Sequence, residues 1–146
     1  MSASQKPSSE LEPIRDRLAL GIRQPWVELI LRGIKTLEIR SQSTNVRGTI
    51  YVYASKTIAE TPDARGAIAS HRVDWDDDGL QRLVGTVDII GCRRAEPADE
   101  AASCVSAGEL NGKYAWELDN AIRFDDPIKP RFLPYGVWFY PFQRRT

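Results

Sequence analysis

Three side chains that could act together on a ligand stand close in the sequence: Lys35, Glu38 and Arg40. Glu38 and Arg40 are two positions apart, so on an extended strand both project from one face about 7 Å apart. Lys35 lies at the turn just before this strand. An ammonium, a carboxylate and a guanidinium on one small area can hold a phosphate or a base edge, or activate water. The same spacing is also typical of a solvated strand with an ordinary ion pair.

A short helix is predicted to position this group. Pro25 is favoured at a first helical position, and Trp26, Leu29 and Ile30 recur at the spacing of one buried helix face. Gly33 is a favoured residue just after a helix end, so we expect about two turns that stop there. The sequence therefore predicts a helix followed directly by the charged strand.

The pattern then changes to a period of two. Thr36, Glu38 and Arg40 fall on one side of the strand, and Leu37 and Ile39 fall on the other. This alternation predicts one core face and one polar face.

These motifs together resemble the ASCH domain family, whose relatives are the PUA-like RNA-binding barrels. The resemblance starts from Gln24-Pro25-Trp26 and from the set Gly33, Lys35, Glu38 and Arg40, in the pattern GxKxxExR. Three later segments are similar to strands of that family, and the likeness extends from about residue 18 to residue 140. Those segments are residues 47–55, 84–91 and 112–118.

The fold that we expect is α+β: a small mixed β-barrel of the PUA-like/ASCH type, with two or three helices packed at its sides. A single domain over residues 17–142 is predicted, between a disordered tail of residues 1–16 and a frayed end of residues 143–146. Thr61 and Pro62 predict a second helix, which runs to about residue 70. Strands are expected at residues 18–22, 49–54, 83–92, 114–118 and 136–140.

The resemblance implies a cleft between the barrel and the first helix, with RNA, a single-stranded nucleic acid or a nucleotide as partner. Lys35 and Arg40 would contact phosphate or a base edge, and Glu38 would accept from an exocyclic amine. Trp26 or Tyr53 would stack on a base, although the helical spacing of Trp26 favours core packing. The expected ligand-binding residues are Gln24, Trp26, Lys35, Glu38, Arg40, Tyr53 and Ser55.

Two other functions stay open. Some ASCH-like proteins suggest amide hydrolysis on acylated cytidine, or RNA cleavage, with Lys35 and Glu38 as catalytic residues. The amidohydrolase-like members use Lys, Thr and Glu, with the Thr at the position of Glu38, so Thr36 would have to replace it here. The second alternative is a protein-interaction module whose basic groove holds an acidic peptide.

Composition narrows the class of protein. His71 is the single histidine, and Cys92 and Cys104 lie in different segments, so neither a metal site nor a disulfide framework is expected. The acidic run 76–78 precedes Gly79 without further ligand spacing and predicts a solvated turn. We therefore expect no metal and no cofactor.

Charge and hydropathy also narrow the choice of partner. The chain has 20 basic and 20 acidic residues, which disfavours a strong generic DNA binder. The acidic excess lies in the middle of the chain, and residues 127–146 carry four basic and no acidic side chains. If the first and last segments pair, they form one basic face for an anionic ligand. The chain has no apolar run near the roughly 20 residues that would span a bilayer, and its N-terminus does not resemble a secretion signal. We therefore expect a cytoplasmic protein without membrane contact.

Overall fold

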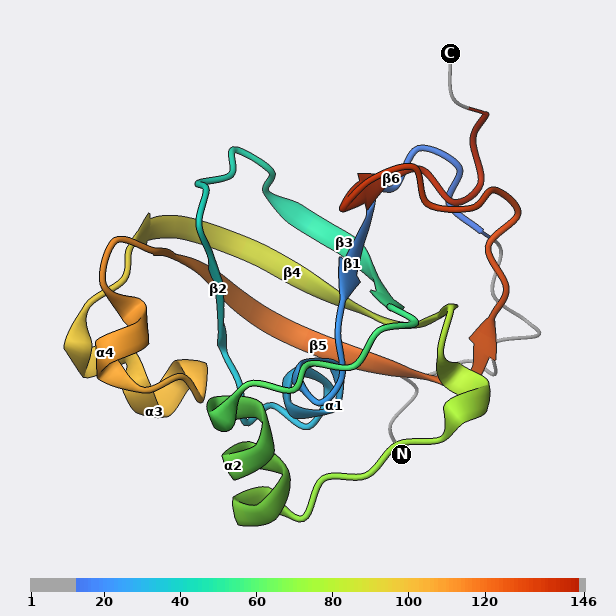
Figure 1. Ribbon diagram of the computed structural model, residues 1–146. Coiled ribbons are helices and arrows are strands. Elements are labelled where there is room, and N and C mark those ends of the chain that lie inside the picture. Colours follow the sequence, from blue (N-terminus) through green and yellow to red (C-terminus); the bar gives the residue numbers. More distant parts are fainter. Residues whose placement is uncertain (1–12, 145–146) are drawn as a thin grey trace, which may run out of the picture.

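The computed structural model describes residues 13–144, which form one curved sheet with short helices around it (Figure 1). In chain order, the elements are β1 (Ala19–Ile22), α1 (Trp26–Leu31), β2 (Leu37–Arg40), β3 (Gly48–Ala54), α2 (Pro62–His71), η2 (Asp77–Gly79), β4 (Arg82–Arg94), η3 (Pro97–Asp99), α3 (Glu100–Ser103), α4 (Ala107–Leu110), β5 (Tyr114–Ile128) and β6 (Trp138–Phe139).

The sheet has six strands in the order β2-β5-β4-β3-β1-β6. β1 and β3 are parallel, while the other neighbours are antiparallel, and β4 and β5 form the long central hairpin. The α+β class and the mixed sheet with helices at its sides are confirmed. Main-chain hydrogen bonds leave β2 and β6 as edges, so the sheet is open between them.

Local sequence signals explain the two longer helices. The Thr61 hydroxyl accepts a hydrogen bond from the Ala64 amide, with Pro62 in the first turn of α2, as predicted. Pro25 stands one position before α1. Gly33 follows α1 with a φ of +76°, a conformation that suits a residue without a β-carbon.

β3 separates two parts of the core. Ile50 and Val52 pack with α1 and the sheet on one side, while Tyr51 and Tyr53 pack with Phe139 on the other. The alternation in β3 is therefore used on both faces. A third cluster joins α1 to α2 and holds α2 beside the first helix; its buried members are Leu29, Ala67 and Val73.

Two glycines in β4 allow close approach by β5. A β-carbon on Gly85 would collide with the Ile122 carbonyl oxygen, and one on Gly91 would collide with the Glu117 carboxylate. The register between the two strands shifts near both glycines. Glycine inside a strand is typical of such irregularities and of close approach by a neighbouring backbone.

Two strands differ in length from their predictions. β5 continues from residue 118 to Ile128, through Pro127, because it pairs with β4 along its length. The closing strand is shorter than predicted and comprises Trp138 and Phe139. The acidic run forms the exposed turn of η2, as expected, where Asp76 accepts from the Asp78 amide.

The ends of the chain are described only in part. Most of the predicted N-terminal tail, residues 1–12, lies outside the described residues, as do residues 145 and 146 of the predicted frayed end. Within the described part, the Ile14 amide donates to the Tyr51 hydroxyl, so residue 14 contacts the domain. No helix between residues 13 and 144 is long and apolar enough to cross a bilayer.

Candidate functional site

The turn from α1 into β2 buries charged side chains. Lys35 is 2% exposed and Glu38 is 4% exposed, whereas Ile39 is only half-buried. The prediction of one apolar core face and one polar face on β2 is therefore wrong, although Leu37 is buried. The physical reason is that Glu38 has cationic partners in the interior, which compensate for the loss of water.

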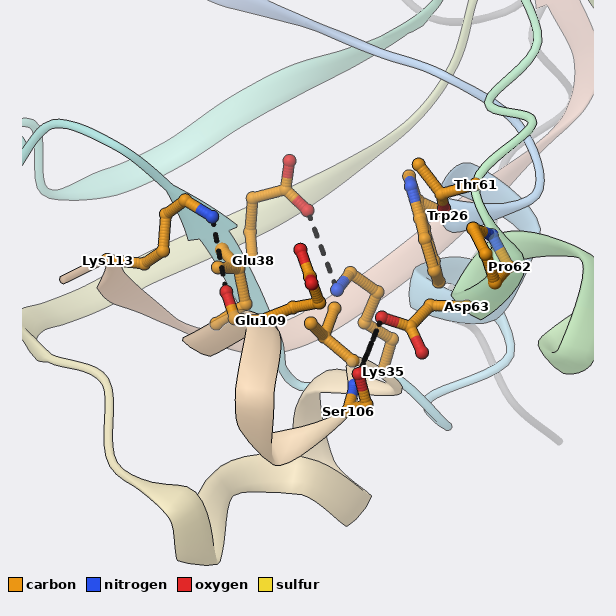
Figure 2. A pocket seen from close by; sticks show the side chains of 11 residues that line it. Trp26, Lys35, Glu38, Thr61, Pro62, Asp63, Ser106, Glu109 and Lys113 are labelled. Atoms are coloured by element: carbon orange, nitrogen blue, oxygen red, sulfur yellow. Dashed lines mark hydrogen bonds and ion pairs between the residues drawn. The ribbon is translucent and has the colours of Figure 1, made fainter. Parts of the chain in front are cut away.

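Lys35 is held by three different groups. Its Nζ donates to the Ser103 carbonyl oxygen at 2.6 Å, lies 3.8 Å from Glu38 Oε1, and stands 4.7 Å from the centre of the Trp26 ring. Figure 2 shows the ammonium pointing toward the Glu38 carboxylate. Burial lowers the pKa of Lys35, while the charge of Glu38 opposes that shift.

Glu38 also binds Arg40, and through it the far side of the sheet. Arg40 Nε donates to Glu38 Oε2 at 2.8 Å, and its Nη2 donates to the Gly21 carbonyl oxygen of β1 at 3.1 Å. The guanidinium also lies over the Trp116 ring, which stacks on Trp138 near β1. Side chains thus connect β2 to β1, two strands that do not pair with each other in the sheet.

One cavity at this bridge, of about 560 Å³, contains most of the predicted binding residues. We call it the basic pocket, because it combines three cationic side chains, Arg23, Arg40 and Lys56, with the single carboxylate of Glu38. Arg23 and Lys56 are exposed, and their side chains make no hydrogen bond or ion pair with another residue of 13–144. The other residues that line the basic pocket are Gly21, Trp26, Ile39, Tyr53, Ser55, Pro134, Gly136 and Val137.

A second cavity, of about 370 Å³, shares the walls Trp26, Glu38 and Ile39 with the first. We call it the inner pocket, and Figure 2 shows the side chains that line it. Its remaining lining residues are Lys35, Thr61, Pro62, Asp63, Val105, Ser106, Glu109 and Lys113.

Most charged groups of the inner pocket are tied to nearby protein atoms. Asp63 Oδ2 accepts from the Ser106 amide at 3.2 Å and from its hydroxyl at 3.1 Å. The Lys113 ammonium donates to the Glu109 carbonyl oxygen at 3.1 Å. These residues were absent from the predicted site, because no local pattern around them indicated that they would meet Lys35 and Glu38.

The predicted site residues fall into three places. Tyr53 and Ser55 line the basic pocket, where burial raises the pKa of the Tyr53 hydroxyl. Trp26 borders both pockets and is half-buried against the core, with the Lys35 ammonium over its ring. Gln24 lines a different cavity, where its Oε1 accepts from the Glu28 amide at the start of α1. Thr36 is exposed and lines neither pocket.

A second ion cluster, centred on the buried carboxylate of Glu28, lies on the other side of α1. Glu28 accepts two hydrogen bonds from Arg123, at 2.8 and 2.6 Å, and one from Arg32 at 3.2 Å. Burial alone would raise the pKa of Glu28, but these guanidinium groups outweigh it and lower the pKa below its ordinary value. Arg123 is 95 residues away in sequence, so no local pattern indicated the pair.

Metal-binding groups are not assembled in the described part of the chain. Among residues 13–144, no three His, Cys, Asp or Glu side chains gather as a metal site. Cys92 and Cys104 are both free thiols. The candidate site therefore consists of the two adjoining pockets and their organic side chains.

Comparison with known proteins gives a consistent result. The family model described as ASCH domain matches residues 20–128. A human protein, Activating signal cointegrator 1 of Homo sapiens, is 32% identical over 80 residues, which is 50% of this chain. That match spans only 14% of the human protein's length.

Solved structures with the same fold were also found. The crystal structure of ASCH from Zymomonas mobilis superposes with a TM-score of 0.56 at 13% identity, covering 87% of this chain and 88% of that one. A mutant of the same Zymomonas mobilis protein has a TM-score of 0.55 at 14% identity, covering 88% and 90%. At these identities the likeness shows the fold alone.

Proposed function

Because the chain belongs to the ASCH domain family, which is a PUA-like family, we propose that its basic pocket binds RNA or a nucleotide. One observation carries this proposal: Arg23, Arg40 and Lys56 face one cavity whose only carboxylate already binds Arg40. The cavity volume of about 560 Å³ lies within the range of small-molecule sites.

The three cations would have different tasks. Arg23 and Lys56 are exposed, which suits contacts to phosphate oxygens. The Arg40 guanidinium is fixed by its hydrogen bonds to Glu38 and to the Gly21 carbonyl oxygen, so its remaining donors are pre-oriented for a phosphate or a base edge. Ser55 and Tyr53 add polar groups at the wall between β1 and β3. Lys35 is tied inside and is assigned to support rather than to ligand contact.

Stacking on Trp26 is limited by its neighbours. The Lys35 ammonium covers one face of the indole, and the ring packs on the helices. A base in the basic pocket would therefore meet part of the indole instead of a free face. The Glu38 carboxylate is left to accept from an exocyclic amine, if such a group reaches it.

The experiment is a calorimetric titration of the protein with the four ribonucleoside monophosphates and with single-stranded RNA. Binding that weakens at least tenfold in Arg23→Ala/Lys56→Ala is the expected result. Lys113→Ala, whose side chain lies in the inner pocket, is the matched control and should retain full affinity. Absence of binding to every ligand, or equal affinity in the double variant, would refute the proposal. Binding of acidic peptides alone would favour the interaction module instead.

A second candidate is hydrolysis in the inner pocket. It is favoured by Lys35, which has a lowered pKa and lies 3.8 Å from Glu38 beside a cavity. In this candidate reaction Lys35 would serve as the base that accepts a proton from the attacking water, and Glu38 would hold its side chain in place. Thr61 lines the same pocket and is better placed than Thr36 to supply a hydroxyl.

This candidate is tested by turnover. Incubation with acylated cytidine and with short RNAs, followed by mass spectrometry, should give product that disappears in Lys35→Met and persists in Lys113→Met. No product from any substrate would reject it. A cytoplasmic location remains part of the proposal, to be checked by microscopy of the tagged chain.

A further inference from the structure

The two most strongly exposed apolar side chains of the β5–β6 connection lie beside the basic pocket. Leu133 is 73% exposed and Val137 is 51% exposed, and both lie in the connection from β5 to β6. Pro134 stands between them and lines the pocket together with Val137. We call Leu133, Pro134 and Val137 the platform.

The platform is anchored rather than loose. The Gly21 amide of β1 donates to the Val137 carbonyl oxygen at 2.9 Å. The Phe132 amide donates to the Pro141 carbonyl oxygen at 2.9 Å, so the connection is tied at both ends. A surface fixed in this way is preformed, and a ligand would lose little conformational entropy by ordering it.

The surroundings of the platform are cationic. Arg23 and Lys56 border it across the pocket, and Arg131 precedes it, with its guanidinium over the Phe132 ring. Residues 127–146 contain no acidic side chain. Apolar side chains and cations without protein partners therefore lie next to each other. A single-stranded nucleic acid fits such a surface, because its bases pack on apolar groups and its phosphates bind cations.

We propose that the platform carries a single strand onward from the basic pocket, so that the ligand is an oligonucleotide and not a mononucleotide. This inference rests on the proposed function of the basic pocket. A base beyond the pocket packs on Leu133 and Val137, while the phosphate between the two nucleotides lies near Arg23 and Lys56. The concave shape of the pocket favours a strand over a flat anionic membrane.

The experiment compares ligand lengths. Affinity is measured by calorimetry for ribonucleoside monophosphates and for RNA hexamers, with the native chain and with the platform variant Leu133→Ser. The native protein should bind the best hexamer at least tenfold more tightly than the matching monophosphate. The Leu133→Ser variant should lose most of that gain and keep its monophosphate affinity, because Leu133 does not line the basic pocket.

Ile90→Ser is the matched control, since Ile90 is 60% exposed on β4 and lines none of the cavities described above. It should keep the full length-dependent gain, and thermal melting should show that all variants fold. Equal affinity for hexamer and monophosphate, or a gain unchanged in the platform variant, would overturn the inference while leaving the proposed function standing. Failure of every ligand to bind would instead remove the proposed function.

An anionic membrane is tested in the same series. The protein should not co-sediment with vesicles of phosphatidylserine and phosphatidylcholine when these are centrifuged. Sedimentation that depends on Leu133, with hexamer binding unaffected by its substitution, would assign the platform to lipid and overturn the inference.

Discussion

The inner pocket and the basic pocket share a wall, yet they hold their charges in opposite ways. In the inner pocket, Lys35 is buried and bonded to Ser103, and Asp63 is bonded to Ser106. In the basic pocket, Arg23 and Lys56 are exposed and have no side-chain partner among the described residues. Charges that already have protein partners stabilise the fold, whereas charges without partners are available to a ligand.

Arg40 combines the two situations, because it has protein partners and also lines the basic pocket. It is partly exposed in the basic pocket, but it also binds Glu38 and the β1 main chain. A single motif, GxKxxExR, therefore supplies one buried lysine, one carboxylate that bridges two cations, and one arginine that lines the basic pocket. The motif alone does not distinguish these roles, because they depend on what packs around each side chain.

The largest expected effect is on stability, from Lys35→Met. The substitution leaves the Ser103 carbonyl without its donor and removes one of the two cations beside Glu38, so we expect a loss of about 2 to 4 kcal/mol in the free energy of unfolding. Urea denaturation measures it. Lys113→Met, in the same pocket but at a more exposed position, should change stability by less than about 0.5 kcal/mol. Equal stability of the two variants would break the comparison between the pockets.

The next effect is on binding, from Arg23→Ala/Lys56→Ala. Loss of two phosphate contacts should weaken RNA binding by about 10- to 100-fold, or roughly 1.4 to 2.8 kcal/mol. Its free energy of unfolding should stay within about 0.5 kcal/mol of the native value, since neither side chain has a structural partner. Calorimetric titration and urea denaturation of the same sample test both halves. A large loss of stability would show that these cations also support the fold.

A smaller effect concerns pH, through Glu28. Its folded pKa lies below the ordinary 4.5, so its ion pairs stabilise the protein above that pH and the contribution is lost as the pH falls through the folded pKa. Glu28→Gln should cost about 1 to 2 kcal/mol at pH 7 and almost nothing in strong acid. Urea denaturation as a function of pH measures the difference. A cost independent of pH would mean that Glu28 acts through packing alone.

The smallest effect is on salt dependence. For single strands, each phosphate contact contributes about −0.7 to the slope of log affinity against log salt, so removal of Arg23 and Lys56 should flatten the slope by roughly 1.4. Lys35→Met should leave the slope unchanged, because its ammonium is enclosed by protein. Titrations at several salt concentrations distinguish the two variants. Flattening by Lys35→Met would indicate that this lysine contacts phosphate after all.

Local signals predicted much of the fold. Thr61 and Pro62 sufficed for α2, and Gly33 sufficed for the end of α1, because caps and left-handed stops act over a few residues. The second half of β5 was not predicted, since exposed polar residues such as Asp119 and Asn120 carry no core-facing pattern. Its pairing with β4 determines that strand.

The candidate site could likewise be predicted only in part. Arg40 was predicted from the motif, and Tyr53 and Ser55 from the family resemblance of the next strand in the sequence; the three line the basic pocket. Arg23 and Lys56 carry no pattern of their own and gain significance only when β1 and β3 lie side by side. Burial of an ion pair likewise depends on distant partners, which period and spacing do not encode.

The bridge from Arg40 to Gly21 has a consequence for how this domain can change. The opposing walls of the basic pocket come from β2 and β1, which no main-chain ladder joins, so the width of the pocket is set by side chains. Substitutions at residue 40 and its contacts could therefore retune the size of the accepted molecule while every strand keeps its register. A side-chain contact of this kind allows ligand selectivity to differ among proteins that keep the same fold.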